Sequence, residues 1–377
     1  MITADVLILG GGVAGLTLAR TLAGDGVAVA LLDAGAADGP DARWTSAGAS
    51  GLPRALLNPW RGRKGDAHPD DLAGLAATWG LADALAGEGA TTGAVRSGVL
   101  RVPGSARQAR AWRDRLGGEA ALAWLEGDAL PPTLHAPFGA LLVTDGGWID
   151  PPRWLGALAA SARRHGATLR GGVRIDRLVR AADGIWTARA AGHDVASAAR
   201  VAVAVGADAR PALDGAPDPW PAWDRTRGDE VHLVPDPTDP TDAADPTDAA
   251  GPTDAVDRAA VRLPRPLAGG IYAAPDRPDG TGGVWVGGGH RPPDVDDPDA
   301  PANLRRALAW ALPGLEGARV GATWSGVRAK REGARPDVRE VAPGVWTFGA
   351  FAGRGFLVAA LEARRLADAW RALPRDG

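Results

Sequence analysis

Residues 6–15 read Val6-Leu-Ile-Leu-Gly-Gly-Gly-Val-Ala-Gly15, an apolar run that enters a glycine-rich turn. An amphipathic stretch follows over residues 13–23, and a second apolar run spans residues 27–32. This order predicts a strand, a turn, a helix and a second strand, which is how a parallel sheet begins. The predicted fold class is therefore α/β (α+β over the whole chain), with a Rossmann-like first domain.

Gly10, Gly12 and Gly15 form a G-x-G-x-x-G pattern at this turn. The first glycine permits the tight turn, the second lets main chain approach a pyrophosphate, and the third lets helix and strand pack closely. Asp33 ends the second strand, where a carboxylate accepts hydrogen bonds from ribose hydroxyls. The pattern predicts an adenine dinucleotide bound by main-chain N–H groups, with Val13, Ala14 and Ala34 beside it. The motif alone does not separate FAD from NAD.

Composition limits the function classes. The chain has 377 residues, enough for two domains, and its net charge of −3 does not favour a nucleic-acid surface. It has no cysteine, which excludes disulfides, thiolate nucleophiles and zinc–thiolate sites. The six histidines show no metal-ligand spacing, so we expect no metal site. No long uncharged apolar run or basic leader is present, and we expect a cytoplasmic protein without a membrane span.

The rest of the chain alternates helical and strand patterns. A Pro-Thr-Asp triplet occurs four times within residues 237–255 and predicts a flexible acidic loop. The expected helices cover residues 69–86, 105–116, 151–165, 303–310 and 356–371. The expected strands cover residues 167–178, 185–190, 201–205, 270–274, 284–287 and 345–348.

Five further segments follow the glycine turn in a distinctive order. They are Ser-Ala-Gly-Ala-Ser-Gly at 46–51, Gly-Trp-Ile-Asp-Pro at 147–151, Val-Ala-Val-Gly-Ala at 203–207, Trp-Ser-Gly-Val-Arg at 324–328 and Gly-Ala-Phe-Ala-Gly-Arg-Gly-Phe at 349–356. In order and spacing, these pieces resemble the FAD-dependent D-amino-acid oxidase and glycine oxidase family. The resemblance covers nearly the whole chain and selects FAD as the cofactor.

The resemblance implies a discontinuous FAD-binding domain, residues 1–80, 143–215 and 325–377, and a mainly antiparallel substrate domain, residues 81–142 and 216–324. It places residues 46–51 along the flavin, Val173 against the adenine, and the turn at 353–356 at the N1 and O2 edge of the flavin. The cofactor-binding residues that it adds to those of the turn are Ser46, Ala49, Ser50, Gly51, Val173, Gly206, Gly353, Arg354, Gly355 and Phe356.

The catalytic candidates also follow from the resemblance. Arg328 matches the family's substrate-carboxylate arginine, and an arginine fork suits a carboxylate. Arg354 lies in the flavin-proximal turn, and Tyr272 lies in a segment resembling the strand that lines the substrate face. Asp276 stands where the family often has arginine. The predicted reaction is oxidation of the C–N bond of a small amine or amino acid, with hydride transfer to flavin N5, an imine product and oxygen as acceptor.

Two alternatives stay open. Residues 55–63 resemble the flavin module of the bifunctional tRNA wobble-uridine enzyme, and Arg54, Arg61, Arg63 and Lys64 form a basic cluster that could touch RNA. The same fold also serves dehydrogenases of 2-hydroxy acids that pass electrons to quinone.

Overall fold

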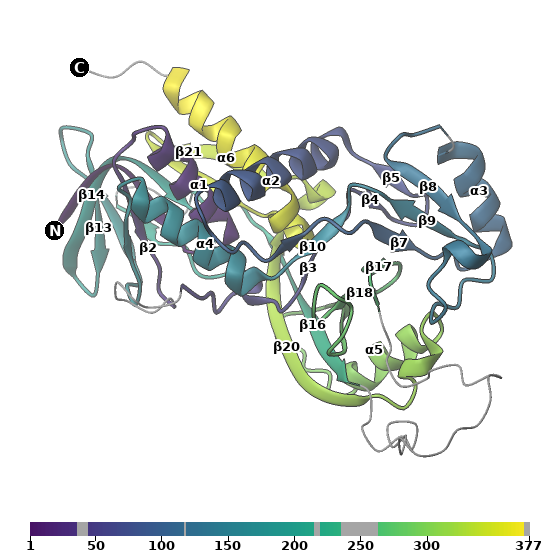
Figure 1. Ribbon diagram of the computed structural model, residues 1–377. Helices are drawn as coiled ribbons and strands as arrows, with labels where there is room; N and C mark the ends of the chain where they lie inside the picture. Colours follow the sequence, from purple (N-terminus) through teal and green to yellow (C-terminus); the bar gives the residue numbers. More distant parts are fainter. Residues whose placement is uncertain (36–43, 117, 215–218, 235–262, 373–377) are drawn as a thin grey trace, which may run out of the picture.

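The computed structural model describes residues 1–35, 44–116, 118–214, 219–234 and 263–372. The molecule is elongated, with strands β13 and β14 at one end and helix α3 at the other (Figure 1). Within the described ranges, no helix is long and apolar enough to cross a membrane. The Pro-Thr-Asp repeat at 237–255 lies outside the described residues.

The glycine turn opens a parallel sheet, as predicted. Strand β1 (Ile2–Leu9) leads into helix α1 (Val13–Gly24) and then strand β2 (Val29–Leu32), which pairs with β1 in parallel. These strands belong to a nine-stranded sheet in the order β11-β2-β1-β14-β13-β12-β15, with β22 on β14 and β21 on β22. Its other strands are β11 (Thr168–Arg170), β12 (Arg177–Arg180), β13 (Trp186–Ala190), β14 (His193–Val203), β15 (Ala212–Leu213), β21 (Asp337–Ala342) and β22 (Val345–Gly349).

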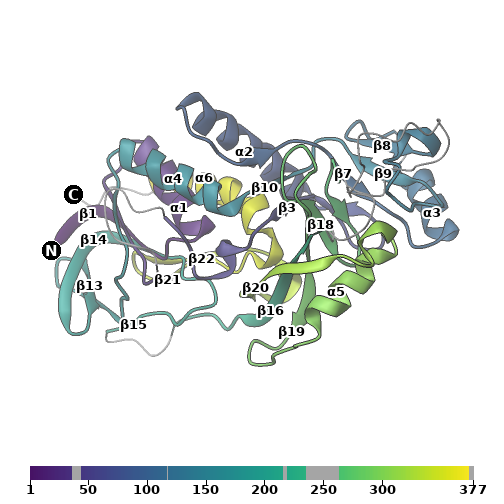
Figure 2. The same ribbon diagram turned by 60° about the horizontal axis from the view of Figure 1, so that its bottom comes forward.

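Helices cover one face of this sheet. Figure 2 shows α1 beside α4 (Pro151–Arg164) and α6 (Gly355–Ala372), with α2 (Pro69–Gly87) packed along α6. The Asp150 side chain accepts a hydrogen bond from Arg153 N and caps α4. Gly166 follows this helix with φ +91°, which fits the predicted stop. Val6 and Ile8 pack towards the helices, whereas Leu7 and Leu9 pack into the core on the opposite face.

An eight-stranded, mostly antiparallel sheet forms the other half, in the order β20-β16-β19-β18-β17-β7-β9-β8. Val231 and Leu233 of β16 pack with Leu304 and Leu308 of helix α5 (Ala300–Ala309) on one face. The alternate residues of β16 therefore lie on the opposite face. The strands are β7 (Val99–Arg101), β8 (Leu122–Leu125), β9 (Ala140–Val143), β16 (Asp224–Val234), β17 (Leu267–Ala268), β18 (Tyr272–Pro275), β19 (Val284–Arg291) and β20 (Arg319–Lys330).

Shorter elements join the two sheets. Helix α3 (Ala106–Leu116) covers the β7–β9 end, and the 3-10 turn η1 (Ala49–Gly51) contacts β20. The small strands are β3 (Ala55–Leu57), β4 (Trp60–Arg61), β5 (Asp66–Ala67), β6 (Ala94–Val95) and β10 (Gly147–Ile149). The remaining 3-10 turns are η2 (Gly127–Ala129), η4 (Pro313–Leu315), η5 (Glu332–Ala334) and η6 (Ala352–Arg354).

Some element boundaries differ from the sequence-based expectations. The expected strand at 167–178 is two strands, because Gly172 with φ +71° interrupts the extended chain. The strand expected at 201–205 begins at His193, since its polar first half pairs with β13. Strands β16 and β20 were not predicted, because their charged residues interrupt the alternation of apolar and polar residues that marks a strand. The domain boundaries at 80, 143, 215 and 325 stay a prediction, and β20 crosses the last of them.

Candidate active site

A cavity of about 470 Å³ lies where the glycine turn, the 46–51 loop, strand β20 and the turn before α6 meet. This volume falls within the roughly 300–1,000 Å³ usual for small-molecule sites. Twelve of the predicted cofactor-binding residues line the cavity. They are Gly10, Gly12, Val13, Ala14, Asp33, Ala34, Ser46, Ala49, Ser50, Val173, Gly206 and Gly355.

The three motif glycines have different structural roles. Gly10 has φ +105°, and a Cβ there would lie 2.5 Å from the Ala204 carbonyl oxygen. A Cβ at Gly15 would lie 1.9 Å from the Gly10 carbonyl oxygen, so Gly15 allows α1 to approach the turn and does not line the cavity. A Cβ at Gly12 would meet only the Ser50 side chain, with Oγ at 2.9 Å. Gly12 is therefore the position where a side chain would narrow the cavity itself.

Asp33 and Ser50 fix the walls on either side of the α1 N-terminus. The Asp33 carboxylate accepts hydrogen bonds from Gly11 N at 2.6 Å and Gly35 N at 2.8 Å. Ser50 Oγ accepts from Val13 N at 3.0 Å. Val173 N donates to the Asp33 carbonyl oxygen at 2.9 Å and so joins the loop after β11 to the same wall. The ribose contact of Asp33 and the adenine contact of Val173 stay predictions.

Five predicted cofactor-binding residues lie outside the lining. Besides Gly15, they are Gly51, Gly353, Arg354 and Phe356. Gly51 is required by the loop, because a Cβ there would lie 2.2 Å from the Ser46 carbonyl oxygen. Phe356 is 8% exposed and packs in the core formed by α1, α4 and α6.

Arg354 departs most from its predicted position. Its guanidinium is 7% exposed, and Nη1 donates to Asp71 Oδ1 at 2.8 Å. Asp71 also accepts a hydrogen bond from Arg61. The Arg354 side chain therefore points from the turn before α6 towards α2, because the buried Asp71 carboxylate needs cations to balance its charge. The structure does not support Arg354 as a catalytic residue at the cavity.

Arg328 of β20 does line the cavity. Its Nη2 donates to the Gly289 carbonyl oxygen at 2.7 Å. Two glycines leave room for the guanidinium, since a Cβ at Gly228 would lie 2.5 Å from Nη2 and one at Gly353 would lie 3.5 Å from Nη1. The arginine thus spans from the eight-stranded sheet to the turn before α6.

Tyr272 lies on the same face of the eight-stranded sheet, although it does not line the cavity. Its ring covers Gly287, where a Cβ would lie 2.1 Å from the ring carbon Cζ. Its hydroxyl donates to the Glu230 carboxylate. Burial raises the pKa of Tyr272, and the Glu230 charge adds to this effect. The tyrosine therefore keeps its proton.

Glu230 of β16 was missed by the sequence analysis. It is 1% exposed, and burial raises the pKa of its carboxyl group to about 7. It accepts a hydrogen bond from Arg54 N at 3.1 Å. In register, Glu230 pairs with Trp324 and Thr226 pairs with Arg328, so Glu230 and Arg328 lie on one face of the sheet. A Val-His-Leu-Val run after Glu230 was the only sequence signal for this strand.

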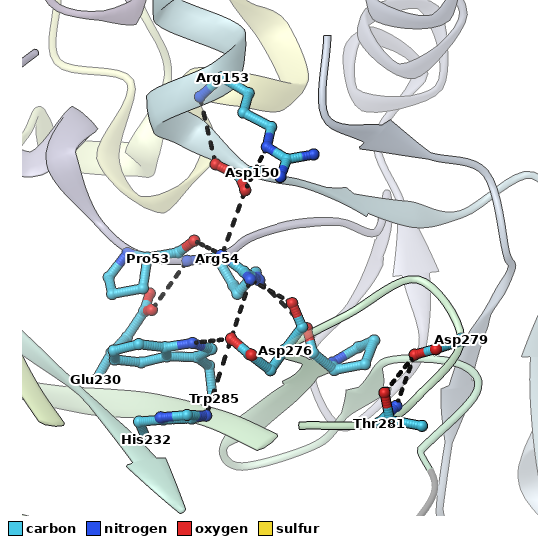
Figure 3. Close-up of polar contacts among 11 residues, drawn as sticks. Pro53, Arg54, Asp150, Arg153, Glu230, His232, Asp276, Asp279, Thr281 and Trp285 are labelled. Carbon is cyan, nitrogen blue, oxygen red and sulfur yellow. Dashed lines mark hydrogen bonds and ion pairs between the residues drawn. The ribbon is translucent and has the colours of Figure 1, made fainter. Parts of the chain in front are cut away.

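Arg54 ties the two halves together. Figure 3 shows its guanidinium between Asp150, at the start of α4, and Asp276, after β18. Nε also donates to the Pro275 carbonyl oxygen at 3.2 Å, and the guanidinium lies over the Trp148 ring with 5.1 Å to its centroid. Asp276, where the family often has arginine, thus pairs with an arginine from the segment just before β3.

The described histidines do not form a metal site. His232 stacks on Trp285 with ring centroids 4.7 Å apart, and burial lowers its pKa (Figure 3). Burial also lowers the pKa of His290. Among the described residues, no group of three or more histidine, aspartate or glutamate side chains could hold a metal ion.

The cavity fits a flavin dinucleotide. Helices α1 and α6 both begin at its wall, so main-chain N–H groups and positive helix ends face it. Glycines at 10, 12, 206 and 355 leave space beside the main chain. The walls from residues 9–10, 12–14, 32–35 and 173–175 suit the ADP half, and those from 46–50, 326–328, 350–352 and 355 suit a ring system at the other end.

The comparisons with known proteins agree with this geometry. Residues 5–369 match the family model DAO, described as FAD dependent oxidoreductase. Glycine oxidase from Geobacillus kaustophilus is 21% identical, with a TM-score of 0.72, and the alignment covers 100% of this chain and 96% of that chain. Iminodiacetate oxidase from Chelativorans sp. BNC1 is 20% identical, with a TM-score of 0.69 and coverage of 99% and 96%.

L-proline dehydrogenase from P. horikoshii is 13% identical, with a TM-score of 0.69 and coverage of 99% and 95%. At such identities the likeness to solved structures shows the fold. A search of curated proteins finds no significant match. The family model spans almost the entire sequence, and the cavity fits the cofactor of that family. The chain therefore belongs to the DAO family of FAD-dependent oxidoreductases.

Proposed function

We propose that this protein oxidises the C–N bond of a small amino acid or a related amine that carries a carboxylate. The observation that carries the proposal is the position of Arg328, which lines the same cavity as the G-x-G-x-x-G turn. Its guanidinium can hold a carboxylate by two parallel hydrogen bonds and so orient the neighbouring C–H bond.

FAD, when bound, supplies the hydride acceptor, and the substrate leaves as an imine after losing a hydride and a proton. Water hydrolyses the imine, and oxygen takes the two electrons and two protons to give hydrogen peroxide. The chain itself has to bind, orient and shield the substrate. Gly12, Ser50 and Gly355 hold the cofactor side of the cavity, and Arg328 holds the substrate side.

Tyr272 and Glu230 form a hydrogen-bonded pair on the same sheet face as Arg328, outside the cavity lining. The phenolic O–H donates to the Glu230 carboxylate, so the pair is satisfied within the sheet and does not by itself distinguish an amine from a hydroxy acid. The Arg328 charge also acts on both groups, so the three side chains lie near one another on one sheet face. The solved neighbours named glycine oxidase and iminodiacetate oxidase add support from the fold.

Oxidation of an amine on a tRNA wobble base has less support. That function would use the basic cluster of Arg54, Arg61, Arg63 and Lys64. Arg54 is bound by carbonyl oxygens and by Asp276, and Arg61 pairs with Asp71. Two of the four basic side chains are therefore already paired with carboxylates of the protein itself.

Anaerobic bleaching of the flavin tests the proposal. The purified holoenzyme is mixed with glycine, sarcosine, proline, lactate and an amine without a carboxylate, and flavin absorbance is followed. We expect bleaching by at least one amino acid, followed by peroxide release when oxygen is admitted. Bleaching by lactate alone would assign the enzyme to hydroxy acids. Bleaching by an amino acid without peroxide release would support oxidation of the C–N bond but would show that the electron acceptor is not oxygen.

A further inference from the structure

A second cavity, of about 520 Å³, lies outside the FAD site. Its walls come from α3, β7, the β17–β18 hairpin and the end of α5, which are neighbours in the half of the molecule away from β14 (Figure 1). It shares no lining residue with the flavin cavity. Ile271, which precedes β18, lines the second cavity, whereas Tyr272, the first residue of β18, contacts Glu230.

The side chain that distinguishes this cavity is Arg101. It is 4% exposed, and its guanidinium lies 4.5 Å from the centroid of the Trp112 ring. Nη2 donates to the Gly62 carbonyl oxygen at 2.6 Å. Nε and Nη1 are buried and have no hydrogen-bond partner within the described part of the chain. Burial alone lowers the pKa of Arg101 to about 10.

The other buried arginine in the described part of the chain, Arg354, is balanced by Asp71 at 2.8 Å. The half-buried Arg54 pairs with Asp276 at 3.2 Å. Arg101 forms no ion pair with any described residue. Burying a cation without a counter-ion costs several kcal/mol, and removing the charge would normally be less costly. An anion held in the cavity would balance this charge.

The remaining lining defines the kind of anion. Among the described residues, the wall contains no aspartate or glutamate, and the exposed Arg63 adds a second positive charge at its edge. Ile271, Leu308 and Trp310 give an apolar surface, and Trp310 is 45% exposed. A cavity with two guanidinium groups and an apolar floor suits a small organic acid better than an inorganic ion.

We propose that the cavity between α3 and the end of α5 binds a small organic anion, whose carboxylate or phosphate pairs with the Arg101 guanidinium and whose apolar part lies against Trp310 and Leu308. This site is separate from the flavin cavity and does not depend on the reaction proposed above.

Calorimetric titration of the holoenzyme tests the site. The background is Arg328→Ala, so that binding at the flavin cavity is weakened, and unchanged flavin absorbance on titration confirms that the ligand is elsewhere. The probes are benzoate, phenyl phosphate, inorganic phosphate and neutral benzyl alcohol. We expect benzoate or phenyl phosphate to bind, and benzyl alcohol to bind at least tenfold more weakly. Stronger binding of phenyl phosphate would identify a phosphate ester as the source of the anion.

Two variants remove the site in different ways. Arg101→Met removes the charge, and Ala307→Trp fills the cavity mouth from an exposed position on α5. Each should weaken binding of the anionic probe at least tenfold. Asn303→Trp is the matched control, because this exposed residue of the same helix does not line the cavity. If Arg101→Met fails to fold, Ala307→Trp still decides the matter. Unchanged affinity in a folded variant, or no binding by any anionic probe, would overturn the proposal.

Discussion

The wall of the FAD cavity near α1 and the eight-stranded sheet present different kinds of chemical group. Near α1, the wall consists largely of glycine and alanine main chain, and its polar groups are N–H donors fixed by the turn. On the eight-stranded sheet, the polar groups are the long side chains of Arg328, Tyr272 and Glu230. A main-chain site tolerates no added bulk, whereas a side-chain site can be retuned by single substitutions. We therefore propose that the first region selects the cofactor and the second selects the substrate.

The largest effect is expected at Gly12. A valine there would enter the space beside Ser50 Oγ, 2.9 Å from the position of a Cβ, and would obstruct the pyrophosphate. The Gly12→Val protein should purify without bound flavin, so its spectrum should lack the visible absorption bands of flavin. Gly80→Val in α2 is the control, because a Cβ there meets no atom within 4 Å. A yellow Gly12→Val protein would contradict the assignment of this wall.

The next effect concerns the buried ion pair between Asp71 of α2 and Arg354 in the turn before α6. Asp71→Asn leaves the buried Arg354 without its carboxylate, 2.8 Å away. We expect the free energy of unfolding to fall by about 3–5 kcal/mol. Denaturant titration measures this loss. Asp70→Asn, which breaks a more exposed pair with Arg365, should cost at most about 1 kcal/mol. If both variants lost the same free energy of unfolding, the buried pair would stabilise the protein no more than the exposed pair does.

A smaller and pH-dependent effect is expected at Glu230. Burial raises the pKa of this carboxyl group from 4.5 to about 7 in the folded protein. The protonated form is therefore favoured by folding, and its contribution to stability is full below the unfolded pKa and is lost as pH rises through the folded pKa. Replacement by glutamine removes this loss. The melting temperature of Glu230→Gln should exceed that of wild type by more at about pH 8 than at about pH 5.

Glu119→Gln, at an exposed carboxyl group, serves as the control for this pH series. A difference between wild type and Glu230→Gln that stays constant across the series would mean that Glu230 does not titrate in the folded protein over this range.

The smallest effect is expected at Asp33. Asp33→Asn keeps one carbonyl oxygen for the N–H groups of Gly11 and Gly35 but loses the charge that favours both hydrogen bonds. Weaker positioning of the ribose should reduce FAD affinity by about 1 kcal/mol, or roughly fivefold. Reconstitution of the apoprotein with FAD, followed by flavin fluorescence, measures the change. An Asp33→Asn protein with unaltered affinity would remove Asp33 from the ribose site.

The same contrast explains what the sequence could predict. The main-chain cradle follows from a local pattern, because the geometry of Gly10 and Gly15 is set by neighbours within a few residues or on adjacent strands. The parallel sheet and helices α1, α4 and α6 were predicted for the same reason: their apolar periodicity and caps are local.

The substrate face was harder to predict. Glu230, Tyr272 and Arg54 are far apart in sequence. The register of β16, β18 and β19 brings Glu230 and Tyr272 together, and Arg54 reaches Glu230 from the segment before β3. Arg354 was misplaced because its partner Asp71 lies on a distant helix. Arg101 was not predicted as a binding residue. Its burial and its lack of a carboxylate partner among the described residues appear only in the folded chain.

The most direct test of the account compares an amino acid with its carboxamide as anaerobic reductants of the flavin, in wild type and in Arg328→Ala. If Arg328 holds the substrate carboxylate, wild type should prefer the acid, and the variant should lose about 2–5 kcal/mol of this preference. Arg319→Ala, at an exposed position on the same strand, should keep the preference. Equal discrimination between acid and amide in wild type and Arg328→Ala would contradict the proposed substrate site.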